Sequence, residues 1–125
     1  MSYRQIAATC PRCTVPLLEA EPGRLTCGSC GGVLIADSVL GELLRAAAPD
    51  AEFPHGVVAF PRRYDAVRIR CPVCRNPMRP GVLFDVPVEQ CQVDGLWTLV
   101  GGIAQIVETA HERSRQRAGE SSGSI

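Results

Sequence analysis

The sequence has no lysine and few aromatic residues. All 13 of its basic residues are arginines, and its 125 residues include only 3 Phe, 2 Tyr and 1 Trp. With so few aromatic rings we expect no single large hydrophobic core, so the fold needs a further source of stability. The length predicts one ordinary domain or two very small ones.

The sequence also lacks segments that cross membranes or direct export. No apolar run reaches the roughly 18–20 residues that a membrane span needs, so we expect no contact with a membrane. The opening residues MSYRQIAATC contain no apolar signal core, which predicts a cytoplasmic protein. In a reducing cytosol the 7 cysteines should remain free of disulfides, and an odd number cannot all pair.

The cysteines recur in two copies of one pattern. The first copy has the motifs Cys10-Pro11-Arg12-Cys13 and Cys27-Gly28-Ser29-Cys30, and the second has Cys71-Pro72-Val73-Cys74 and Cys91-Gln92-Val93-Asp94. Each copy continues with an apolar stretch and then a segment typical of a helix, 38–48 in the first and 102–110 in the second. The repeat predicts two units of one design, over residues 1–48 and 67–117.

Between the two motifs of each unit the sequence predicts a β-hairpin. In the first unit, strands over 17–20 and 24–26 flank Pro22 and Gly23, which suit the central positions of a type II turn. In the second unit we expect strands over 81–85 and 88–90, with Pro87 placing the later strand at a sheet edge or in the turn.

The segments outside the units have the composition of linkers. Residues 49–66 contain several prolines, which favours an extended connector. Residues 118–125 are rich in Gly and Ser and are expected to be disordered. The predicted fold class is therefore small α+β, with two metal-binding hairpins in tandem and a helix after each.

The first four cysteines have the spacing of a metal site. Two residues between cysteines let a tight turn direct both sulfurs at one point, and two such turns complete a tetrahedron. Four thiolates suit Zn²⁺ best, and Fe²⁺ fits the same geometry. With no open position and no neighbouring acid or base, the ion bound by Cys10, Cys13, Cys27 and Cys30 is predicted to be structural.

The second unit has an aspartate where a fourth cysteine is expected. Cys71, Cys74 and Cys91 match the pattern, and Asp94 takes the last position. Because a carboxylate can bind zinc, one reading is a second zinc ion held by these four residues. The alternatives are that this unit binds no metal, or that His55 or His111 supplies the missing ligand.

The two units resemble the transcription-factor-IIB-type zinc finger of small bacterial proteins, a zinc-ribbon family. The resemblance rests on the motifs above and on Gly31-Gly32-Val33 in the first unit and Met78, Gly95-Leu96-Trp97 and Gly101 in the second. It implies two tandem zinc ribbons, the second degenerate, with nucleic-acid binding by analogy. Asp94 stands where a common variant of the family has histidine, and Leu34 stands at the position of the family's Trp.

The basic residues suggest a nucleic-acid partner. Between Pro61 and Pro80 the chain has six arginines and one acidic residue. The candidate contacts to DNA or RNA are Arg62, Arg63, Arg68 and Arg70, with Arg68 and Arg70 on one face of a predicted strand. Against this reading, the formal net charge is zero, and metal-bound thiolates make it negative.

The alternative function is a zinc-stabilised module that binds a protein partner. The sequence contains no His-Glu-x-x-His, no glycine-rich phosphate loop and no nucleophile elbow. We therefore expect neither an enzyme nor a small-molecule substrate.

Overall fold

The computed structural model describes residues 8–49 and 69–123. They form six strands and two helices, which are β1 (Leu18–Glu21), β2 (Arg24–Thr26), β3 (Val33–Ile35), α1 (Asp37–Ala47), β4 (Arg79–Leu83), β5 (Val86–Cys91), β6 (Gly95–Thr98) and α2 (Gly102–Gly123). The fold is thus a small α+β fold, as predicted. No helix in these ranges is long and apolar enough to cross a membrane.

All six strands belong to one antiparallel sheet. Their order is β1-β2-β3-β6-β5-β4, so the three strands of each half lie together and β3 meets β6 at the centre. In this central pair Leu34 lies opposite Trp97, and Ile35 lies opposite Leu96. The two halves are therefore not separate hairpins but the two sides of a single sheet.

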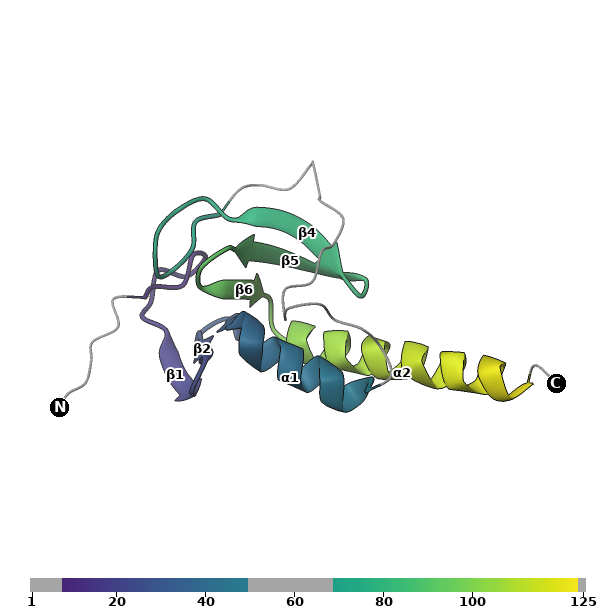
Figure 1. The fold of residues 1–125 in the computed structure, drawn as a ribbon. Coiled ribbons are helices and arrows are strands. Elements are labelled where there is room, and N and C mark those ends of the chain that lie inside the picture. Colours follow the sequence, from purple (N-terminus) through teal and green to yellow (C-terminus); the bar gives the residue numbers. More distant parts are fainter. Residues whose placement is uncertain (1–7, 50–68, 124–125) are drawn as a thin grey trace.

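The sheet separates two hydrophobic cores. The two helices lie side by side against one face (Figure 1), where their apolar residues pack on Ile35, Leu96 and neighbouring strand residues. The other core contains Leu34 and Trp97 together with cysteines of both halves. Because successive side chains of a strand point to opposite faces, β3 and β6 contribute to both cores, and all four residues of β6 are buried.

The predicted first hairpin and both predicted helices are present. β1 and β2 are joined through Pro22 and Gly23, and Gly23 has a φ of 82°, the left-handed conformation that this turn requires. Helix α1 begins after Ala36 and ends before Pro49, which cannot continue a helix. Helix α2 turns its buried residues Ile103, Ile106 and Ala110 toward the sheet.

The expectation that Pro87 marks an edge strand or a turn was wrong. Pro87 lies within β5, an interior strand between β4 and β6. The proline is tolerated because β6 pairs only with Glu89–Cys91, the other end of β5. In the strand register Pro87 is paired only with Val82 of β4, while on the β6 side its carbonyl oxygen accepts the Thr98 hydroxyl at 3.5 Å, so no backbone N–H of Pro87 is required. The turn before β5 is formed instead by Phe84 and Asp85, which both have positive φ.

The predicted disorder of residues 118–125 was also wrong for residues 118–123, which continue α2. The preceding residues 112–117 are mostly Glu, Arg and Gln, which favour helix, and a helix that packing has already nucleated extends at small cost per residue. Figure 1 shows α2 running beyond the end of α1. Apart from Pro49, the predicted linker 49–66 lies outside the described residues.

A prediction for stability follows from two glycines of similar conformation but different surroundings. Gly95 and Gly101 both have positive φ, at 120° and 79°. A Cβ on Gly95 would lie 2.1 Å from the carbonyl oxygen of Ile35, whereas a Cβ on Gly101 would have no atom within 4 Å. Gly101→Ala should cost roughly 1–2 kcal/mol, for backbone conformation alone. Gly95→Ala should cost at least about 2 kcal/mol more, because the backbone of β3 must move.

Urea denaturation of the two zinc-loaded variants measures this difference. Equal losses of unfolding free energy would contradict the close approach of β6 to the end of β3.

Candidate metal centres

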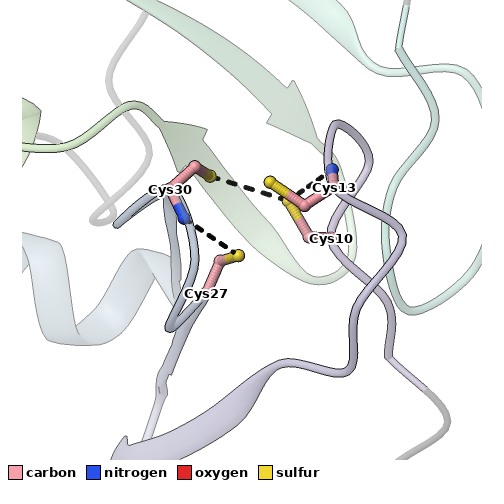
Figure 2. Close-up of side chains that lie close together, drawn as sticks. All are labelled: Cys10, Cys13, Cys27 and Cys30. Carbon is pink, nitrogen blue, oxygen red and sulfur yellow. Dashed lines mark hydrogen bonds between the residues drawn. The ribbon is translucent and has the colours of Figure 1, made fainter.

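The structure brings the first four predicted ligands together. We call Cys10, Cys13, Cys27 and Cys30 the first cluster; their sulfurs all lie within 4.8 Å of one another. Figure 2 shows two loops facing each other, one carrying Cys10 and Cys13 and the other Cys27 and Cys30. All four are free thiols, with Cys10 and Cys27 buried. The spacing of the motifs therefore predicted this site correctly.

The distances fit a tetrahedral zinc site. With zinc–sulfur bonds of about 2.3 Å, the edge of a regular tetrahedron of sulfurs is about 3.8 Å. The Sγ atoms of Cys10 and Cys30, which belong to different loops, lie 3.8 Å apart. A disulfide would bring two sulfurs to about 2.0 Å. The donor set and its geometry both suit a Zn²⁺ ion.

The backbone of each motif holds its first sulfur in place. Cys10 Sγ accepts hydrogen bonds from the backbone N–H groups of Arg12 and Cys13, at 3.4 and 3.3 Å. Cys27 Sγ accepts the N–H groups of Ser29 and Cys30, both at 3.4 Å. These donors stabilise thiolate charge, which a metal-binding cysteine must carry.

The second cluster, Cys71, Cys74, Cys91 and Asp94, has the same compactness. Its ligand atoms also lie within 4.8 Å of one another, and the Sγ atoms of Cys74 and Cys91 lie 3.6 Å apart. Asp94 Oδ2 is 3.4 Å from Cys71 Sγ and 3.6 Å from Cys91 Sγ. Bonds of about 2.3 Å to sulfur and 2.0–2.2 Å to oxygen give a tetrahedral sulfur–oxygen edge of about 3.6 Å. This geometry favours the reading in which Asp94 completes a second zinc site.

The histidine alternative receives no support. His111 lies on α2, where its Nδ1 atom is 3.0 Å from the backbone oxygen of Ala47 at the end of α1. Within the described ranges it belongs to neither cluster. His55 lies outside the described residues. Among the residues that the structure describes, the fourth member of the second cluster is Asp94, the one that the repeat itself supplies.

The raised pKa values of several thiols disfavour a metal-free state in which every sulfur of a cluster is charged. The neighbouring Cys30 thiol raises the pKa of Cys13 to about 11, and burial raises the pKa of Cys71 to about 12. Burial also raises the pKa of Cys10. Only Cys27 changes in the other direction, to a pKa of about 7, because the Cys30 N–H donates to its sulfur. A bound dication would lower the pKa of every ligand thiol, since it favours each thiolate, and would therefore oppose the upward shifts at Cys10, Cys13 and Cys71.

The two metal centres border the same core. Buried cysteines of both clusters pack with Leu34, Met78 and Trp97 on the face of the sheet away from the helices. The ring of Trp97 lies so close to Gly32 that an added Cβ would be 2.4 Å from a ring carbon. Sequence reasoning did not place the two clusters together. The glycine pair Gly31-Gly32 before a buried strand is the local signal for such a close approach.

The candidate nucleic-acid residues are only partly described. Arg62, Arg63 and Arg68 lie outside the described residues. Arg70 is exposed, and its Nη1 atom donates to the backbone oxygen of Arg75 at 3.1 Å. Arg75, which was not among the candidate contacts, thus lies next to Arg70 at the motif that carries Cys71 and Cys74.

Comparison with protein-family models, with curated proteins and with solved structures found no match for this chain. The resemblance to the zinc-ribbon family stays a prediction from the sequence. The features of this chain that bear on its function are the two clusters and the surfaces around them.

Metal analysis tests both centres. We expect two equivalents of Zn²⁺ per chain, with chelation causing loss of folded structure, because units of this size bury too little surface to fold alone. Asp94→Ala should leave the first centre filled and lower the zinc affinity of the second centre more than about 100-fold. The loss should be this large because a direct ligand is removed, whereas removal of a residue that only hydrogen-bonds to a ligand costs about 10–100-fold. Asp94→Asn is the size-matched control. A single equivalent that Asp94→Ala does not change would mean that the second cluster binds no metal.

A second prediction concerns pH. A thiol whose pKa lies above neutrality must lose its proton when the metal binds, so the apparent metal affinity falls by about tenfold per pH unit for each such proton. The first centre has four thiol ligands, whereas the second has three thiol ligands and a carboxylate. Acidification should therefore release metal with a steeper pH dependence from the first centre. Titration with a chromophoric chelator measures both, and equal slopes would contradict the proposed ligand sets.

Proposed function

We propose that this chain is a zinc-dependent nucleic-acid-binding protein in which two zinc-ribbon units hold structural ions. The structural role is supported by the number of ligands, since each cluster offers four ligand atoms within 4.8 Å of one another, enough to fill a tetrahedral site with no open position. The donor atoms also anchor loops that cover one face of the sheet. Removal of the ions would then remove the surface that those loops form.

The observation that carries the nucleic-acid proposal is a groove between the two Cys-Pro-x-Cys loops. This knuckle groove has a volume of about 530 Å³, and its lining comprises Thr9, Cys10, Pro11, Thr14, Ile69, Arg70, Cys71, Pro72 and Arg75. Each loop contributes its first cysteine and the following proline, so the groove follows the junction between the two repeats. Its charged side chains are both arginines.

The chemistry of the groove suits a nucleotide strand. The half-buried Pro11 and Ile69 offer apolar surface to a base, while the guanidinium groups of Arg70 and Arg75 offer charge and hydrogen bonds to phosphates. Four anionic ligands around a divalent ion leave two negative charges at each centre. The arginines of the groove therefore have to offset this charge before they attract phosphate, which predicts moderate affinity with strong dependence on salt.

A second candidate function is docking of a protein partner. Several large apolar side chains are exposed, with Val93 at 84%, Val100 at 71% and Leu18 at 62%. Val93 lies between Cys91 and Asp94 of the second cluster in the sequence, and Val100 lies against Gly31, which directly follows Cys30 of the first cluster. Such residues favour a protein interface more than a nucleic-acid interface, and the same binding experiment separates the two functions.

Titration of labelled single-stranded and duplex oligonucleotides by fluorescence anisotropy tests the proposal. The zinc-loaded protein should bind, with an affinity that falls as salt rises. Arg70→Gln together with Arg75→Gln should weaken binding about tenfold and lower the salt slope by about one unit per lost phosphate contact.

Arg45→Gln together with Arg115→Gln is the matched control. It removes two exposed arginines from the helices, away from the groove, and should change binding little. Absence of binding at low salt by protein that holds both ions would overturn the proposal and favour the protein-docking function.

A further inference from the structure

The two metal centres differ in how their fourth ligand is held. In the first cluster, Cys30 Sγ accepts the backbone N–H of Gly32 at 3.4 Å, so a backbone donor fixes it. In the second cluster, the Asp94 carboxylate contacts the thiols of Cys71 and Cys91, and no backbone N–H of the described residues donates to it. The contacts that hold the Asp94 carboxylate are therefore those with the other ligands of its own cluster.

The remainder of the motif is the same in both halves. The N–H of Asp94 donates to Cys91 Sγ at 3.4 Å, as the N–H of Cys30 donates to Cys27 Sγ. The backbone therefore brings the fourth position to the same place in each cluster. The difference lies in the ligand atom and in its support.

A cavity reaches the second cluster at Asp94. Its volume is about 260 Å³, and its lining comprises Glu19, Gly23, Arg24, Leu25, Leu34, Ala36, Val73 and Asp94. Most of these residues belong to the first half of the chain. The aspartate is half-buried and lines this Asp94 cavity, while its carboxylate contacts the thiols of Cys71 and Cys91.

We propose that Asp94 is a displaceable ligand and that the Asp94 cavity is a binding site for a small thiol, whose sulfur takes the fourth ligand position. This inference depends on metal binding by the second cluster and is independent of nucleic-acid binding. In the exchange the metal–oxygen bond of Asp94 breaks, a metal–sulfur bond forms, and the proton of the thiol passes to solvent. Asp94 remains a carboxylate, and nothing is oxidised or reduced.

A thiol is the ligand class that the site favours. Zinc held by three thiolates takes sulfur as readily as oxygen, and a carboxylate is the hardest donor of the set. The cavity walls at Leu25, Leu34 and Val73 are apolar and suit the carbon chain of a small thiol. Arg24 in the same lining offers a positive charge to the incoming thiolate, although it also pairs with Glu21 at 3.5 Å and the lining includes the acidic Glu19.

Cobalt spectroscopy tests the proposal, because the charge-transfer and d–d bands of Co²⁺ report how many sulfurs bind the ion. The protein is loaded with two equivalents of Co²⁺ in a non-thiol reductant and then titrated with 2-mercaptoethanol. The first centre has four sulfurs throughout and cancels in difference spectra. We expect the second centre to change from three sulfurs to four and to approach the spectrum of Asp94→Cys, in which the fourth sulfur belongs to the chain.

Two variants make the outcome decisive. Asp94→Cys should not respond to the thiol, since its fourth position is already filled by sulfur. Asp94→Ala should bind the thiol roughly tenfold more tightly than the wild type, because no carboxylate has to be displaced, and its melting temperature should rise when the thiol is added. The Asp94→Ala arm does not depend on the folding of Asp94→Cys.

Other outcomes overturn the proposal. These are an unchanged wild-type spectrum at millimolar thiol, an equal response of wild type and Asp94→Cys, removal of cobalt by the thiol, or failure of the second centre to bind cobalt. Nucleic-acid binding that persists in any of these cases would leave the proposed function intact.

Discussion

Antiparallel pairing between β3 and β6 is the contact on which the rest of the molecule depends. It joins two three-stranded halves into one sheet and places Leu34 directly opposite Trp97. Both residues are buried in the core that contains the cysteines. The helices gather on one face of the sheet and both cysteine clusters on the other.

This arrangement links the two metal centres energetically. Buried cysteines of both clusters share one core with Leu34 and Trp97. Loss of an ion from one cluster would loosen its loops and expose part of the core against which the other cluster packs. Free energy of metal binding at one centre thus contributes to folding of the other, which is how two sites become coupled without direct contact. Although the sequence has few aromatic residues, its single Trp is buried where the two halves of the sheet meet, and there it contributes apolar surface to the shared core.

Local signals predicted the local structure. The Cys-x2-Cys spacing identified both clusters, Pro22 and Gly23 marked the first turn, and Pro49 follows the end of α1. The β3–β6 pairing was not predictable in this way, because it joins residues more than sixty positions apart and no short motif encodes it. The expectation for Pro87 was wrong for the same reason. The cost of a proline in β5 depends on which residues of β5 pair with the distant strand β6, and β6 pairs only with the other end of β5.

The repeat also shows where the two halves have diverged. Their loops have the same backbone pattern, with Thr14 and Arg75 both at positive φ and with equivalent hydrogen bonds from Cys10 and Cys71. Against this common frame, the change from Cys30 to Asp94 alters ligand chemistry with little change in geometry. A cavity borders the altered ligand, and its walls come mainly from the opposite half. The first half thus supplies both a cluster of four cysteines and most of the residues around Asp94, so the surroundings of the second cluster depend on the fold of the first half.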